Sequence, residues 1–134
     1  MRYIPFLILV LFAAPVLALT PMRPESLPFD VKLAGQAPAP AGSVAKVSAP
    51  VPSDALLELG VSETEQVIVN FFVSDDNGII KTENSSAKEI IMSTGAKTKI
   101  NQTMSKNSLP PGTYLANIFA QSTGQTARIV FTVK

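Results

Sequence analysis

The chain has 134 residues, of which 11 are basic and 10 are acidic, and it contains no cysteine, histidine or tryptophan. Without imidazole or thiolate groups it lacks the side chains that most often act as metal ligands, nucleophiles and general bases, so we expect no catalytic residue, no metal and no cofactor. The nearly balanced charge gives no general reason to bind nucleic acid or an anionic membrane surface.

An apolar run opens the chain, which begins MRYIPFLILVLFAAPVLALT. Arg2 precedes this run, and Val16-Leu17-Ala18 has small residues at its first and third positions, which predicts a signal peptide over residues 1–18 that is cleaved after Ala18. A membrane anchor is the alternative, which Pro15 and the small residues disfavour. We therefore expect export to the periplasm, the cell surface or the extracellular space, with no membrane span after cleavage. The missing cysteines favour a bacterial source.

Residues 19–53 hold seven of the eleven prolines, interleaved with alanine. Proline lacks a backbone donor and favours extended polyproline geometry, so this composition predicts a disordered, solvated Pro/Ala-rich linker rather than a packed element. Two alternatives remain open within it. One is a short strand over residues 43–47, and the other is a strand over residues 29–33 that joins the sheet of the following domain.

Short runs rich in β-branched and aromatic residues occupy the rest of the chain and predict strands. They span residues 55–61, 66–73, 78–82, 88–92, 97–104, 113–121 and 126–133. The turn sequence Asp75-Asp76-Asn77-Gly78 predicts one hairpin, and Ser122-Thr123-Gly124 predicts another. Ser62 and Glu65 also match a helix capping box, but the β-branched and aromatic residues that follow favour a strand.

The fold class follows from the alternation of apolar residues near the end of the chain. Alternate residues of the last run share one apolar face: Ala127, Ile129, Phe131 and Val133. In the preceding run, Tyr114 and Ile118 oppose Leu115 and Phe119, so both faces are partly apolar. Two sheets packed face to face explain this pattern. We expect an all-β, immunoglobulin-like β-sandwich of about seven short antiparallel strands over residues 54–134, with the aromatic rings in its core.

Charge is divided along the chain. Residues 54–76 carry six acids and no base, whereas residues 77–134 carry seven bases and two acids. Pairing of the acidic half with the basic half across neighbouring strands explains this division without a partner. The alternative is a basic patch that docks on an acidic protein surface, formed by Lys97, Lys99 and Lys106. The run DDNG has no further carboxylate at ligand spacing, so we interpret it as a turn rather than as a calcium loop.

The stretch LPPGTY, residues 109–114, leads into an apolar run. Pro110 and Pro111 restrict the backbone and Gly112 permits a tight turn, which predicts a strand that starts at Thr113 in a defined register. We expect Tyr114 to bury its ring and keep its hydroxyl at the rim of the core. Recognition of this stretch by another protein is the alternative.

Residues 50–134 resemble the C-terminal sorting domain of the bacterial Por (type IX) secretion system. The resemblance rests on Pro50-Val51-Pro52 before a strand, on Asp75 to Gly78 after one, on Leu109, Gly112 and Tyr114, and on a terminal apolar strand that ends at Lys134. Val51 stands where that family has asparagine, and little cargo precedes the domain. Small secreted immunoglobulin-like proteins of the same bacteria are similar in the same features.

Together these features give one functional hypothesis and two alternatives. We expect a non-enzymatic, secreted β-sandwich module that mediates protein–protein interaction at the cell envelope, with another envelope or secreted protein as its partner. The resemblance implies the first alternative, a sorting or attachment signal that is recognised through Leu109, Gly112, Tyr114 and Lys134. A carbohydrate-binding module is the remote alternative, because the rings that stack on sugars are usually those of tryptophan and tyrosine.

Overall fold

The computed structural model describes residues 27–134, so the predicted signal peptide over residues 1–18 lies outside the described residues. Strands are the regular elements, together with one short 3-10 turn, η1 (Thr82–Asn84). In chain order the strands are β1 (Val31–Leu33), β2 (Ala39–Ala41), β3 (Val44–Lys46), β4 (Leu56–Leu59), β5 (Gln66–Val73), β6 (Glu89–Thr94), β7 (Lys97–Lys99), β8 (Gly112–Ala120) and β9 (Gln125–Val133). The prediction of an all-β fold is confirmed.

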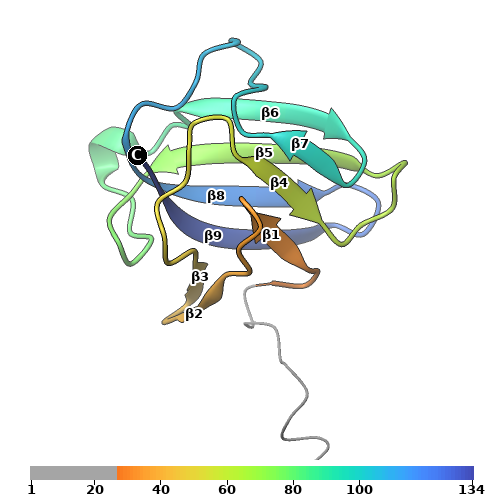
Figure 1. Ribbon diagram of the computed structural model, residues 1–134, viewed down its shortest axis with the longest axis horizontal. Coiled ribbons are helices and arrows are strands. Elements are labelled where there is room, and N and C mark those ends of the chain that lie inside the picture. Colours follow the sequence, from red (N-terminus) through yellow and green to blue (C-terminus); the bar gives the residue numbers. More distant parts are fainter. Residues whose placement is uncertain (1–26) are drawn as a thin grey trace, which may run out of the picture.

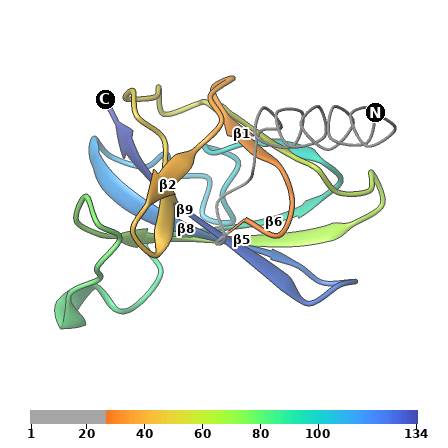
Figure 2. The same cartoon turned by 90° about the horizontal axis from the view of Figure 1, so that it is seen from below.

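The strands form two sheets that pack face to face as a β-sandwich. The smaller sheet has the order β1-β4-β7 and the larger has the order β2-β3-β9-β8-β5-β6 (Figure 1). A quarter turn shows β1 and β5 in opposite layers (Figure 2). All strand pairs are antiparallel except β3 with β9, which run parallel. The sequence therefore predicted the two-sheet architecture and left β1 and β3 open as alternatives, but missed β2 and this parallel pair.

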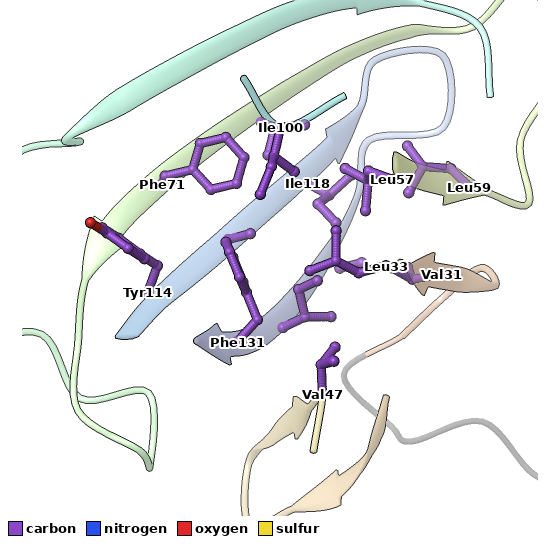
Figure 3. Packing of buried hydrophobic residues seen from close by; sticks show 14 of the residues in the cluster. Val31, Leu33, Val47, Leu57, Leu59, Phe71, Ile100, Tyr114, Ile118 and Phe131 are labelled. Atoms are coloured by element: carbon purple, nitrogen blue, oxygen red, sulfur yellow. The ribbon is translucent and has the colours of Figure 1, made fainter. Parts of the chain in front are cut away.

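One face of each sheet forms the core. Strand β5 alternates buried Val67, Val69 and Phe71 with half-buried residues, as expected for a strand with one face inside. The predicted inner face of β9 is confirmed, because Ala127, Ile129, Phe131 and Val133 all join the main buried cluster. Figure 3 shows side chains from both sheets that point toward one another across this core. The rings of Phe71 and Phe131 meet edge to face, with centroids 5.8 Å apart.

The prediction that residues 19–53 form a disordered linker is wrong for residues 27–53, and the domain does not begin at residue 54. Buried side chains run through this segment: Leu27, Phe29, Val31, Leu33, Val44, Ala45, Val47 and Val51. Strand β1 pairs with β4, and β3 pairs with β9. Both short strands left open as alternatives are therefore present, and the segment supplies part of the core.

The prolines of this segment lie where a sheet tolerates them. Pro40 is in β2, which is an edge strand and pairs only with β3, so one side of it needs no backbone donor. Pro50 and Pro52 flank Val51, whose own N–H donates to the Thr132 carbonyl at 2.8 Å. The Val51 carbonyl in turn accepts from the Lys134 N–H at 3.0 Å. A proline-rich segment can thus pair with a strand when the residues between its prolines supply the backbone N–H donors.

The predicted strand over residues 78–82 is absent, and the turn before it does not close a hairpin directly. Asp75 Oδ1 accepts from the backbone N–H groups of Asn77 and Ile79, at 2.8 and 2.9 Å. This turn directs the chain across the outer face of the larger sheet, where Ile80 packs on a small apolar cluster. The next strand along the chain is β6, which pairs with β5 and begins only at Glu89. Tertiary packing of residues 74–88 replaces the strand that their composition suggests.

Candidate interaction surface

The stretch at residues 109–114 forms a packed corner at the start of β8. Leu109 and Tyr114 are buried, and the Tyr114 ring lies 5.9 Å from that of Phe131. The Tyr114 hydroxyl donates to the Pro110 carbonyl at 2.6 Å, and Figure 3 shows this oxygen at the margin of the core. Gly112 has a φ of 155°, a backbone conformation that glycine adopts far more readily than other residues. A tyrosine that bonds back to the backbone a few residues upstream stabilises the corners of many β-sandwiches.

This packing accounts for the motif and removes Leu109 and Tyr114 from the surface, whereas Pro110 and Pro111 stay exposed. Burial raises the pKa of the Tyr114 hydroxyl, as expected for an acid held away from water. Leu109 and Tyr114 are therefore core residues. Among the residues expected to be recognised, Lys134 is exposed, and its backbone N–H is held by the Val51 carbonyl beside β9.

The three lysines of the expected basic patch do not share one element. Lys97 and Lys99 are exposed on β7 and flank the buried Thr98. Lys106 lies in the connection from β7 to β8, next to Ser105, whose hydroxyl donates to the Glu89 carboxylate at β6. The structure brings Lys97 and Lys99 together and places Lys106 beside the other sheet.

Opposite charges from the two halves of the chain lie at neighbouring register positions in one place. Glu58 of β4 lies opposite Lys97 of β7, and on its other side it lies opposite Lys32 of β1. Elsewhere, an ion pair joins Lys46 Nζ to Asp76 Oδ1 at 3.5 Å. Lys97 therefore has an acidic neighbour within the domain, which weakens the case for a free basic patch.

The sequence did not single out an apolar row on the outer face of the larger sheet. Met92, Ile68 and Phe119 occupy neighbouring positions on β6, β5 and β8, and we call these three residues the outer row. Met92 is 61% exposed, and the other two are half-buried. Neighbouring side chains on one face of a sheet lie about 5 Å apart, so the outer row forms a continuous apolar strip. The sequence signal that could have identified the outer row was Phe119, a large apolar residue on the face of β8 that points away from the core.

Another part of this outer face is covered by the chain itself. Val44, Leu115 and Val130 form a second buried cluster, against which Ile80 packs. Gly78 lies so close that an added Cβ would be 3.1 Å from side-chain atoms of Val44 and Val130. The connection over residues 74–88, green in Figures 1 and 2, therefore shields these residues and leaves the outer row uncovered.

On β5, β8 and β9 a polar row separates the covered and uncovered parts, and Ile90 occupies the β6 position of this row. Asn70, Asn117 and Arg128 are register neighbours on β5, β8 and β9. Arg128 Nε donates to Asn117 Oδ1 at 3.3 Å, and the Arg128 side chain is exposed. The outer row thus has a polar border with one cation, the composition typical of the edge of a protein interface.

The Glu65 carboxylate joins two connections at one end of the sandwich. Its Oε1 accepts from the Ser122 N–H at 2.9 Å, and its Oε2 accepts from the Ser122 hydroxyl. Glu65 is buried and lines an open polar cleft of about 490 Å³ together with Ser62, Thr64, Gln66, Gln121 and Ser122. The capping-box pattern of Ser62 and Glu65 therefore forms a turn rather than a helix start. The Glu65 carboxylate bonds to Ser122 in the β8–β9 hairpin, and not to the Ser62 N–H as in a capping box.

These hydrogen bonds make the stability of the domain sensitive to acid. The Ser122 hydroxyl and N–H lower the pKa of Glu65 below its ordinary value of 4.5. A carboxyl with a depressed pKa in the folded state stabilises the fold above its unfolded pKa and loses that effect as the pH falls through its folded pKa. We therefore expect the melting temperature to drop on acidification below pH 4.5, and to drop less in Glu65→Gln.

Thermal melts followed by circular dichroism across this pH range test the expectation. Glu63→Gln is the matched control, because Glu63 is an exposed carboxylate in the same connection. Equal acid sensitivity in wild type and Glu65→Gln would contradict the assignment.

Within residues 27–134, no helix is long and apolar enough to cross a bilayer, and no group of three or more acidic, histidine or cysteine side chains is placed to hold a metal ion. Comparisons with family models, with curated proteins and with solved structures give no match for this chain.

Proposed function

We propose that the chain is an exported, non-enzymatic β-sandwich module that binds another protein at the cell envelope through the outer face of its larger sheet. The observation that carries this proposal is the outer row. Three large apolar side chains lie side by side on a face that the chain covers elsewhere with its own connection. Exposed apolar strips with polar borders are typical of protein interaction sites.

An immunoglobulin-like fold is part of the proposal. The order β1-β4-β7 corresponds to strands A, B and E, and the order β9-β8-β5-β6 corresponds to G, F, C and C′ of such a sandwich. The Tyr114 hydroxyl bond to Pro110 lies at the start of the strand that corresponds to F, where immunoglobulin-like domains place a tyrosine corner. Both features support the assignment.

The sorting-signal alternative receives less support. Leu109 and Tyr114 serve the core, so in the folded domain they offer little surface to an export machine. A carbohydrate site is also disfavoured, because Tyr114 is buried and the rings of Phe72 and Phe119 have no hydroxyl to bond to a sugar.

A photo-cross-linking experiment in the native host tests the proposed function. A photoreactive amino acid in place of Met92 is expected to give an adduct with one discrete envelope protein, because Met92 is the most exposed member of the outer row. The matched control carries the same amino acid in place of Lys99, which is exposed on the opposite sheet.

An adduct at Lys99 alone would favour the basic patch, and no adduct at either position would contradict the proposal. The intact mass of the exported protein adds an independent check. Cleavage after Ala18 with Lys134 retained is expected for a binding module, whereas loss of C-terminal residues would favour the sorting signal.

A further inference from the structure

The chemistry of the partner can be inferred from what borders the outer row, on the basis of the proposed function. We infer that the partner presents a carboxylate next to large apolar side chains, so that the carboxylate pairs with Arg128 while the apolar groups cover Met92, Ile68 and Phe119. The Arg128 side chain is exposed, and its Nε donates to the Asn117 amide oxygen. No carboxylate pairs with it in the described part of the chain.

Arg128 lies close enough to the outer row for one partner segment to contact both. Asn117 is the register partner of Arg128, and Phe119 is two residues further along the same strand, on the same face. Two residues of a strand span about 7 Å, and neighbouring strands are about 5 Å apart. A carboxylate and an apolar side chain that are two to four residues apart in a peptide can bridge such a separation.

The bond to Asn117 leaves most of the guanidinium available. Arg has five N–H donors in a planar fork, and only the Nε donor is used here. That fork matches the geometry of a carboxylate, and weak hydration makes guanidinium better suited than ammonium to a partly covered site. Lys46, another cation on this face, is already paired with Asp76. Charge complementarity therefore points to Arg128 as the position that selects an acidic partner.

A second copy of the chain does not fit this surface as well. The positions that border the outer row include Gln66, Asn70, Ile90, Thr94, Asn117, Thr126 and Arg128, none of which is acidic. Two copies joined face to face would bring two unpaired guanidinium groups into one interface, and like charges in an interface cost free energy. The surface is complementary to a different protein that supplies the negative charge.

Selection of peptides tests this inference without knowledge of the partner. A random peptide library displayed on phage is selected on the exported wild-type protein, and the enriched peptides are synthesised for titration calorimetry. We expect enriched peptides to carry Asp or Glu within four residues of large apolar side chains. Their affinity is expected to fall about tenfold in Arg128→Glu and to weaken as salt is added.

Four variants separate the possible results. Lys99→Glu, on the opposite sheet, should bind the peptides as wild type does. Met92→Asp should abolish binding. A library selected on Arg128→Glu should enrich Lys or Arg in place of the acidic residue. Arg128→Lys keeps the positive charge but lacks the planar fork of donors. If the charge reversal in Arg128→Glu perturbs folding, intermediate peptide binding by Arg128→Lys supports the role of Arg128.

The outcomes distinguish this inference from the proposed function. Peptides that require Met92 but bind equally to Arg128→Glu would overturn the acidic preference and leave the interaction surface in place. Peptides that bind Met92→Asp and Arg128→Glu as tightly as wild type would overturn both proposals, and so would a library without enrichment. Sedimentation that reveals a dimer disrupted by Met92→Asp would show that a second copy occupies the surface, which contradicts the inferred partner.

Discussion

Leu33→Ala is expected to lower the free energy of unfolding by about 3 kcal/mol, because it removes a fully buried side chain and leaves a cavity. Leu33 lies in β1, opposite Leu57 of β4, within the main buried cluster. A domain of this size has a total stability of roughly 5–10 kcal/mol, so such a loss would be large. Urea unfolding monitored by circular dichroism measures it as a shift in the midpoint.

Lys32→Ala provides the matched control. Lys32 belongs to the same strand but is exposed, and surface substitutions usually change stability by less than about 0.5 kcal/mol. If residues 27–53 were a solvated linker, both substitutions would be silent. Equal midpoints for Leu33→Ala and wild type would therefore contradict the packing of β1 on the sandwich.

Tyr114→Ala is expected to cost about 3–5 kcal/mol, because it removes a buried ring that packs on Phe131 and also removes the hydroxyl bonded to Pro110. Tyr114→Phe keeps the ring and loses only the hydrogen bond. The sequence alone predicts almost no effect of that change. The bond of 2.6 Å to the Pro110 carbonyl corrects this expectation to a loss of about 1 kcal/mol.

The same urea experiment measures both Tyr114 variants. A cost for Tyr114→Ala that far exceeds the cost for Tyr114→Phe is expected, and it would show that the ring contributes more than the hydroxyl. If Tyr114→Ala unfolds at the wild-type midpoint, the ring does not belong to the core, and the role of this stretch in recognition must be reconsidered.

The sequence by itself determined the long strands of the larger sheet. The predicted run over residues 66–73 coincides with β5, and the runs over residues 113–121 and 126–133 match β8 and β9 to within one residue at each end. These segments are long and rich in β-branched and aromatic residues, so local sequence predicts their type, and the alternation within residues 126–133 also predicts the inner face of β9. The hairpin at Ser122 to Gly124 follows from the same local information, because Gly124 adopts a φ of 68°.

Short segments were beyond the reach of that reasoning. Strands β1, β2 and β3 have three residues each, too few for a periodic pattern. Their composition suggests an extended, unpaired chain, and only the pairing of β1 with β4 and of β3 with β9 gives their few apolar residues a core to enter. The opposite error occurred at residues 78–82, where a suitable composition lacks a neighbouring strand to pair with.

The candidate surface was decided almost entirely by tertiary structure. The sequence does not reveal that Ile68, Met92 and Phe119 adjoin on the outer face of the larger sheet, or that residues 74–88 cover a different part of that face. The bond from Ser122 to Glu65 likewise joins residues that are 57 positions apart. Local sequence determines the period and the inner face of a strand, because these depend on adjacent side chains. Which outer surfaces meet, and which stay exposed, depends on the register and order of strands that are distant in the chain.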